Sequence, residues 1–183
     1  MTRLRHIPNI ITFFRLLLIP PVAWAILREH YATAFWLFTL AGFSDGVDGF
    51  LARRFSWQSE LGATLDPIAD KLLMIVSFYC LSWQGVLPWW LFAVVLARDL
   101  IIVGGALAYQ FVTRALKMEP IFLGKVNTVV QIVMIMVLLV HLAYRQVPVA
   151  WVDALAVLLL LSTLASGVAY VVIWLNKTRS AAG

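Results

Sequence analysis

Residues Val149–Leu175 decide the fold class, and they run VAWVDALAVLLLLSTLASGVAYVVIWL. Asp153 is the single charged side chain in this segment. The run exceeds the roughly 20 mostly apolar residues that an α-helix needs to cross the hydrocarbon core of a bilayer. Because backbone polar groups must be paired within the segment in lipid, a helix is the structure that such a run can adopt there. The segment is therefore predicted to be a transmembrane α-helix.

Five further stretches of similar apolar character precede this segment. They are Ile10–Leu27, Tyr31–Arg53, Leu61–Ser82, Trp89–Val112 and Leu123–Tyr144. The links between them are too short to form a separate soluble domain. With 63% hydrophobic and 13% charged residues, the chain of 183 residues is too apolar for a soluble protein of this length. The sequence predicts an all-α integral membrane protein with six transmembrane helices, and residues 1–183 are expected to form one membrane domain.

The distribution of lysine and arginine predicts the orientation, because cytoplasmic loops contain the excess of basic residues. One side of the membrane receives Arg3, Arg5, Arg53, Arg54, Arg114, Lys117, Lys125, Lys177 and Arg179, and the other side receives Arg28 and Arg145. Both termini are therefore predicted to be cytoplasmic. Arg15, Lys71 and Arg98 are left at membrane depth in this scheme. The expected location is the inner, cytoplasmic membrane of a bacterium, with the lipid bilayer and not nucleic acid as the surrounding partner.

Several other classes of protein fit the sequence less well. The first apolar run resembles a secretory signal, but Arg15 within it and the five later spans favour a retained helix. The single cysteine, Cys80, excludes an internal disulfide or a thiolate cluster. The three histidines are far apart in the sequence and lack the spacing of metal ligands.

Four of the nine acidic residues lie within one short part of the chain. They are Asp45, Asp48, Asp66 and Asp70. Asp45 and Asp48 are three residues apart near the end of the second predicted helix, and Asp66 and Asp70 are four apart near the start of the third. Each pair therefore shares one helix face. A tight turn between the two helices would let all four carboxylates face one pocket.

Carboxylates at bilayer depth need a cation to neutralise them. Each costs at least about 2.5–3.5 kcal/mol at the centre of a spanning helix on insertion scales. An all-oxygen ligand set favours magnesium or manganese over zinc, and such ions commonly bridge carboxylates to substrate phosphates. The alternative is that these aspartates cap helices at the membrane surface, which is reasonable for one aspartate but not for four in register. The cluster predicts a divalent metal site for a diphosphate substrate.

The same segment resembles the signature of the CDP-alcohol phosphotransferases. It runs Asp45-Gly-Val-Asp48-Gly49-Phe-Leu-Ala52-Arg53, and after eight residues Gly62-Ala-Thr-Leu-Asp66-Pro-Ile-Ala-Asp70. The similarity extends to Ile7-Pro-Asn9-Ile-Ile-Thr12-Phe-Phe-Arg15 and to Gly124-Lys125-Val-Asn127-Thr128. It covers most of the chain. Within the family, the chain is most similar to the branch of phosphatidylglycerophosphate synthases and CMP-forming cardiolipin synthases.

This resemblance implies a role for each matching residue. Asp45, Asp48 and Asp66, with Asp70, would hold two Mg²⁺ or Mn²⁺ ions against the diphosphate of CDP-diacylglycerol. Asp70 would also act as the base that takes the proton of an acceptor hydroxyl. Gly49, Ala52, Arg53 and Gly62 would line the cytidine and diphosphate pocket, with Asn9 and Thr12 adding hydrogen bonds. The site would open at the cytoplasmic leaflet, and the family leads us to expect a homodimer.

The acceptor is expected to be phosphatidylglycerol, which would give cardiolipin and CMP. Users of glycerol 3-phosphate typically place a basic residue eight positions after the arginine of an Ala-Arg-Glu phrase, and another in a Gly-Lys-x-Lys-Thr phrase. In this chain these positions are Ala106, counted from Arg98, and Asn127. A phosphatidylglycerophosphate synthase that uses glycerol 3-phosphate stays the alternative.

Two alternatives from other classes share some of these features. A small cation transporter would explain intramembrane carboxylates, but not the glycines, Ala52 and Arg53 at fixed spacing. A prenyl-diphosphate enzyme would show an Asp-Asp-x-x-Asp phrase, which the sequence lacks. For Arg98 and Asp99, a structural ion pair and a functional role fit equally well. As neighbours they point about 100° apart on a helix, so different partners are expected.

Overall fold

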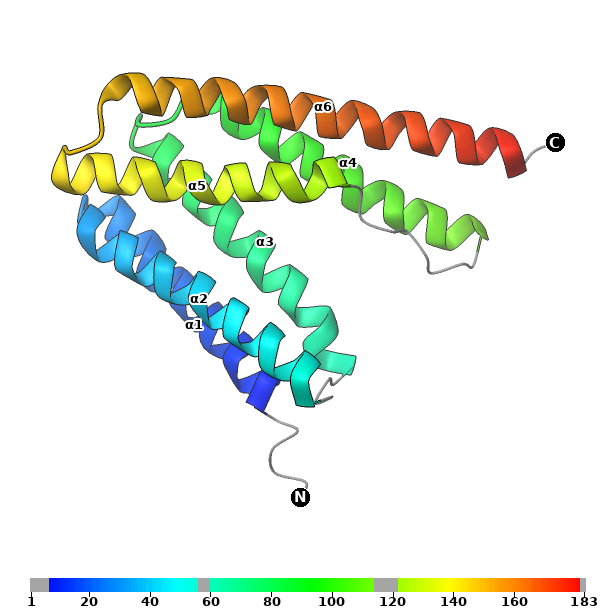
Figure 1. The fold of residues 1–183 in the computed structure, drawn as a ribbon, viewed down its shortest axis with the longest axis horizontal. Helices are drawn as coiled ribbons and strands as arrows, with labels where there is room; N and C mark the ends of the chain where they lie inside the picture. The colour runs from blue at the N-terminus through cyan, green and yellow to red at the C-terminus, as the bar shows by residue number, and fades with distance from the viewer. Residues whose placement is uncertain (1–6, 56–59, 114–121, 182–183) are drawn as a thin grey trace. The chain divides into compact units, whose positions relative to one another are not determined.

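The computed structural model describes the backbone of residues 7–55, 60–113 and 122–181, and the side chains of residues 12–44, 68–105 and 122–173. Over these ranges the chain is helical, with short turns and no strand. The elements are α1 (Ile7–Leu27), α2 (Tyr31–Phe55), α3 (Glu60–Trp83), α4 (Trp89–Thr113), α5 (Phe122–Tyr144) and α6 (Val149–Ala181) (Figure 1). The prediction of one helix for each apolar stretch is confirmed.

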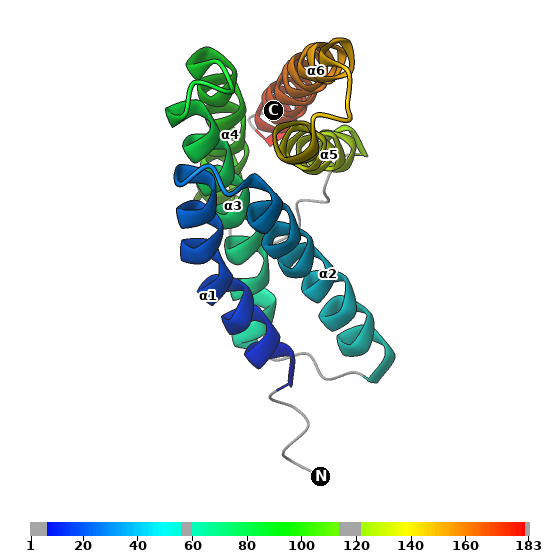
Figure 2. The same ribbon diagram turned by 90° about the vertical axis from the view of Figure 1, so that its left-hand side faces the viewer.

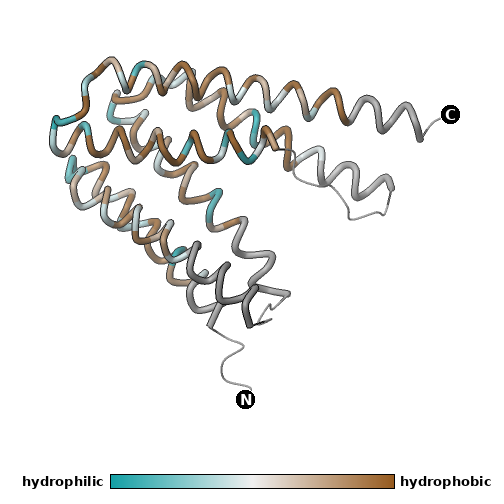
Figure 3. The backbone as a smooth tube through the Cα atoms, in the orientation of Figure 1, coloured by the Kyte–Doolittle hydropathy of each residue, from teal (hydrophilic) through white to brown (hydrophobic). Residues whose placement is uncertain are grey.

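Two of these helices have the length and composition of membrane spans. They are Phe122–Tyr144 and Val149–Ile173, with mean hydropathies of 2.2 and 2.3. Hydrophobic positions run along most of both (Figure 3). In the described part of α1, the apolar stretch Thr12–Leu27 is shorter. That all six helices cross a bilayer, with both termini in the cytoplasm, stays a prediction.

The helices form two compact units, and α5 contributes to both. The first unit comprises residues 1–87 and 135–148, and the second comprises residues 88–134 and 149–183. In the first unit α1 packs against both α2 and α3 (Figure 2). In the second unit α4 packs against α6.

The core of the first unit consists of small and branched apolar side chains. Val22, Ala25, Ile26, Ala34 and Leu81 are fully buried. The two alanines let the helix backbones approach closely. This packing brings the polar residues of α1 beside those of α3.

Short turns join α1 to α2 and α3 to α4. Glu29 has a φ of 60° and Gly85 a φ of 71°, a left-handed conformation that allows sharp reversal after a helix. The Gln84 side-chain amide donates to the carbonyl oxygens of Leu27 at 2.8 Å and Ile26 at 3.3 Å. These carbonyls end α1 and have no partner within the helix, so Gln84, in the turn after α3, caps the C-terminal end of α1.

Candidate active site

An ion pair joins α1 to α3 in the first unit. Arg15 Nη1 donates to Asp70 Oδ1 at 2.7 Å, across 55 residues of sequence. The Arg15 side chain is fully buried, whereas 47% of the Asp70 side chain is exposed. A buried arginine requires a hydrogen-bonded anion, because desolvation of an uncompensated charge is costly. The pair gives the buried Arg15 an anionic partner, and it orients one oxygen of the predicted base.

Thr12 lies one helical turn before Arg15 on α1. Residues three apart on a helix share a face, and both side chains have no exposed surface. Thr12 therefore lies on the same buried face of α1 as Arg15, whose guanidinium contacts Asp70 on α3.

The backbone confirms the helical spacing of the carboxylates. Asp45 and Asp48 both lie within α2, and Asp66 and Asp70 both lie within α3. Each pair shares a helix face, as expected from its spacing. The side chains of the other predicted metal and pocket residues lie outside the described residues: Asn9, Asp45, Asp48, Gly49, Ala52, Arg53, Gly62 and Asp66. Among the described side chains no group of three or more metal-ligating residues occurs, so the four-carboxylate pocket stays a prediction.

A second ion pair lies within the second unit. Arg98 Nη1 donates to Asp99 Oδ1 at 2.7 Å, and both side chains are more than nine-tenths buried. From the sequence, Arg98 and Asp99 were expected to contact different partners. This expectation was wrong, because the two side chains contact each other. Because the arginine stem is long and flexible, the guanidinium turns back to the adjacent carboxylate despite the angle between the two Cα–Cβ bonds.

Arg98 of α4 also forms hydrogen bonds to α6 and lies close to α5. Its Nε and Nη2 donate to Ser166 Oγ at 3.2 and 2.5 Å, and its guanidinium lies 5.8 Å from the ring centroid of Tyr170. A Cβ on Gly124 of α5 would lie 3.0 Å from Tyr170 Oη and 3.2 Å from Arg98 Nη2. Both distances are tighter than most Cβ contacts, so a larger residue would require these side chains to shift. These contacts support a structural role for Arg98 and Asp99.

Asn127 is a further buried polar residue of α5. Its Oδ1 accepts hydrogen bonds from Ser162 Oγ at 2.8 Å and Thr163 Oγ1 at 2.9 Å, both on α6. The Asn127 side chain has no exposed surface. The two hydrogen-bond partners of Asn127 Oδ1 are therefore neutral hydroxyls, at the position where glycerol 3-phosphate users would have a lysine.

Sequence reasoning missed the hydroxyl groups of α6. Ser162, Thr163, Ser166 and Tyr170 all contact polar or charged groups of α4 or α5. Their spacing of one, three and four residues places them along one side of α6. A polar stripe in an otherwise apolar helix is a signal of helix–helix hydrogen bonding, and it could have indicated these contacts.

In the part of the chain that the structure describes, the protein is all-α, and two of its helices are long and apolar enough to cross a membrane. The family model for CDP-alcohol phosphatidyltransferase matches residues 5–175, and the chain belongs to this family. The resemblance inferred from the aspartate motif is thus confirmed. Because the match covers the segments around both ion pairs, Arg15 and Arg98 lie within the family domain.

The curated relatives are named for two different enzymatic activities. The chain is 32% identical to cardiolipin synthase (CMP-forming) of Rattus norvegicus over 70% of this chain and 48% of the relative. It is 32% identical to CDP-diacylglycerol–glycerol-3-phosphate 3-phosphatidyltransferase 1, chloroplastic, of Oryza sativa subsp. japonica over 92% of this chain and 56% of the relative. It is 40% identical to cardiolipin synthase (CMP-forming) of Streptomyces coelicolor over 56% of this chain and 52% of the relative. The chain spans about half the length of these relatives.

Proposed function

We propose that the protein transfers the phosphatidyl group of CDP-diacylglycerol to phosphatidylglycerol, releasing CMP and forming cardiolipin. The reacting hydroxyl is one on the terminal glycerol of phosphatidylglycerol. Its oxygen forms a bond to the phosphorus that bears the diacylglycerol, the bond from that phosphorus to the CMP oxygen breaks, and CMP leaves. Family membership and the names of the relatives support the reaction class.

In this proposal Asp45, Asp48, Asp66 and Asp70 hold two Mg²⁺ or Mn²⁺ ions. The support is chemical, since the donor set consists of carboxylates and the spacing of three or four residues is that of one helix face. Bound metal would supply charge stabilisation to the attacking and leaving oxygens. Arg53 adds positive charge for the donor diphosphate. Asn9, Thr12, Gly49, Ala52 and Gly62 complete the nucleotide pocket.

Asp70 accepts the proton of the attacking hydroxyl. The exposed half of its side chain leaves room for an acceptor to approach, and Arg15 orients the carboxylate through Oδ1. Asp70→Asn retains the size of the side chain but removes its basicity, so it should abolish turnover while the protein still binds CDP-diacylglycerol. Wild-type turnover by this variant would rule out Asp70 as the base.

The choice of acceptor depends most on Asn127. Glycerol 3-phosphate has a phosphomonoester with a charge of about −1.5 to −2, if it titrates like other phosphomonoesters. Such an ion needs a cation close by, and two unit charges about 4 Å apart interact by roughly 4 kcal/mol at an effective dielectric of 20. Asn127 is neutral, fully buried and bonded to two hydroxyls. It therefore offers no such charge.

A phosphatidylglycerophosphate synthase is the second candidate. The rice relative with the glycerol-3-phosphate name aligns with 92% of this chain, more than either cardiolipin synthase relative does. Lys125, next to Gly124, is an alternative source of positive charge. This candidate predicts glycerol 3-phosphate as the better acceptor.

Separate acceptor assays distinguish the two candidates. Purified protein with CDP-diacylglycerol and added magnesium should release CMP with phosphatidylglycerol and much more slowly with glycerol 3-phosphate. In the folded double variant Ala106→Arg with Asn127→Lys, use of glycerol 3-phosphate should rise relative to wild type. Faster CMP release from wild type with glycerol 3-phosphate would favour the second candidate. An unchanged ratio in the folded double variant would count against these two positions as acceptor contacts.

We further propose that the reaction takes place at the cytoplasmic leaflet of a bacterial inner membrane and that the protein is a homodimer. The charge distribution along the sequence supports the orientation, because most basic residues lie on one predicted side. In this orientation the donor enters laterally from the bilayer and soluble CMP leaves to the cytoplasm.

A further inference from the structure

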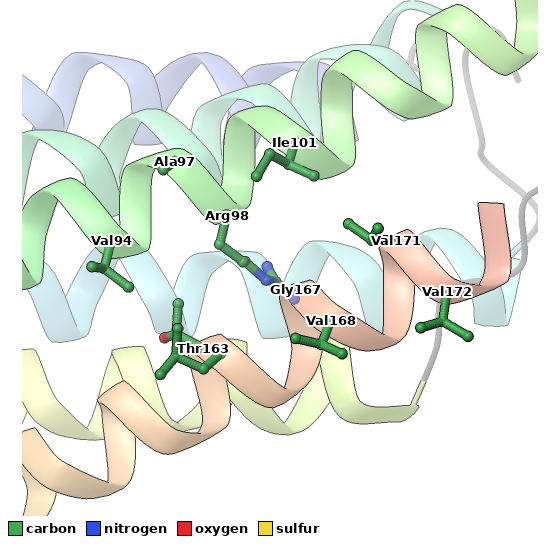
Figure 4. A pocket seen from close by; sticks show the side chains of 10 residues that line it. Val94, Ala97, Arg98, Ile101, Thr163, Gly167, Val168, Val171 and Val172 are labelled. Carbon is green, nitrogen blue, oxygen red and sulfur yellow. The ribbon is translucent and has the colours of Figure 1, made fainter. Parts of the chain in front are cut away.

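A groove lies between α4 and α6 in the second unit. Its volume is about 440 Å³, within the range of sites that hold small ligands. The walls are aliphatic: Val94, Ala97 and Ile101 come from α4, and Leu164, Val168 and Val172 from α6 (Figure 4). Several wall residues are open to the surroundings, with Val168 63% and Leu164 50% exposed. The groove is thus an accessible hydrocarbon surface and not an enclosed core void.

The two polar side chains that line the groove, Arg98 and Thr163, already have hydrogen-bond partners. Arg98 extends from α4 toward Gly167 (Figure 4), but its nitrogens donate to Asp99 and Ser166. Thr163 Oγ1 donates to Asn127. An occupant therefore meets aliphatic groups and already paired polar groups, so a hydrocarbon chain fits better than a polar ligand.

The groove follows the part of α6 that leads to a basic C-terminal end. The α6 residues that line the groove lie in the second half of Val149–Ile173, one of the two candidate membrane spans among the described residues. Lys177 and Arg179 follow Val172 by five and seven residues within the same helix, which is about 7–10 Å at 1.5 Å per residue. A phospholipid has the same order of parts, an apolar chain and then a phosphate. Basic residues next to a membrane helix attract anionic headgroups.

We propose that this groove binds one acyl chain of an anionic bilayer phospholipid, with its headgroup at the basic end of α6. The lipid is a resident lipid, which packs between α4 and α6 without being consumed. The site depends neither on the acceptor used nor on the catalytic activity. In this proposal a lipid, and not a second protein chain, covers the aliphatic faces of α4 and α6.

Native mass spectrometry of the purified protein tests this site. Phosphatidylglycerol and phosphatidylcholine are offered in turn, and bound lipid is counted for each chain. Wild type should retain one phosphatidylglycerol in the groove, beyond any that is bound as acceptor, and much less phosphatidylcholine; the groove-bound lipid is the one that the variants below should lose. Ala97→Phe fills the groove and should reduce retained phosphatidylglycerol at least five-fold. The matched control is Ala93→Phe, an exposed alanine one turn earlier on α4 that does not line the groove, and it should behave as wild type.

A second pair of variants approaches the groove from the opposite wall. Val168→Phe should lose the lipid as Ala97→Phe does, and Val157→Phe, at a similarly exposed position outside the groove, should not. Neutralising Lys177 and Arg179 to Gln should lower retention of phosphatidylglycerol by about five-fold for each residue, with phosphatidylcholine unchanged. This difference would identify the headgroup end of the site.

Two results would overturn the proposal. One is equal lipid retention by the groove variants and their matched controls. The other is dissociation of a dimer by Ala97→Phe with unchanged lipid, which would make the groove a contact between two copies of the chain. Because the measurement needs no turnover, a failure of the proposed reaction would leave the lipid result intact.

Discussion

Replacing Arg15 with leucine should slow phosphatidyl transfer by roughly 10- to 150-fold. Arg15 Nη1 lies 2.7 Å from Asp70 Oδ1, so the variant removes a charge-assisted hydrogen bond from the proposed base. The gross Coulomb attraction at this distance is about 6 kcal/mol at an effective dielectric of 20. Because 47% of the Asp70 side chain is exposed, solvent screening reduces this value. A hydrogen bond to a charged group typically contributes about 1.5–3 kcal/mol net. If the whole of this energy is lost from transition-state stabilisation, kcat falls by roughly 10- to 150-fold.

The assay is CMP release from CDP-diacylglycerol with phosphatidylglycerol in nanodiscs, over a range of concentrations of both substrates. Since Arg15 acts through Asp70, kcat should fall while the KM for the donor changes little. Arg15→Lys retains the charge and should recover part of the rate. The control is Arg28→Leu, which removes an exposed arginine after the end of α1 and should leave kcat unchanged.

Protein stability distinguishes positioning from folding. Leucine is compatible with the buried site, and Asp70 can still be solvated, so the variant should stay monodisperse and melt within a few degrees of wild type. Wild-type kcat in a well-folded Arg15→Leu protein would refute the reasoning. It would show that the ion pair between α1 and α3 has only a structural role.

Three further predictions follow from the sequence and the structure. Excess EDTA should stop CMP release, and added Mg²⁺ or Mn²⁺ should restore it; undiminished release would refute the metal site. Gly124→Ala should lower the free energy of unfolding by about 1–3 kcal/mol through overpacking, and with it the melting temperature, because the new Cβ would lie 3.0 Å from Tyr170 Oη. In the control Gly104→Ala, the new Cβ has no neighbour within 4 Å, so this variant should be neutral or stabilising. Equal melting shifts in the two variants would contradict the close approach. A cysteine at Lys117 should be labelled only from the cytoplasm and one at Gln84 only from outside, and the reverse would overturn the predicted topology.

The helices could be predicted from the sequence because local hydrophobic patterning determines them. Each predicted span coincides with an observed helix, and the starts of the fourth and sixth helices agree at Trp89 and Val149. The largest extension is at the end of α6, which continues to Ala181 instead of stopping near Leu175. Lys177 and Arg179 are good helix formers and do not interrupt the helix, although they leave the apolar region.

The partners of the buried charges could not be predicted from the sequence. The sequence placed Arg15 at membrane depth, but its contact with Asp70 depends on how α1 approaches α3 over a separation of 55 residues. The contact between Arg98 and Asp99 depends on a rotamer, which the helical angle between neighbours does not reveal. The hydroxyls of α6 that contact Asn127 and Arg98 likewise follow from tertiary packing. The aspartate motif could be found because its residues lie close together in the chain.

The identity of the lipid product tests the proposed function most directly. Purified protein in nanodiscs receives CDP-diacylglycerol, Mg²⁺ and equal concentrations of phosphatidylglycerol and glycerol 3-phosphate, and the products are identified by mass. Asp70→Asn serves as the inactive control. Cardiolipin is the product that we expect to dominate. Phosphatidylglycerophosphate as the main product, absent from the control, would contradict the proposal and make the protein a glycerol-phosphate enzyme.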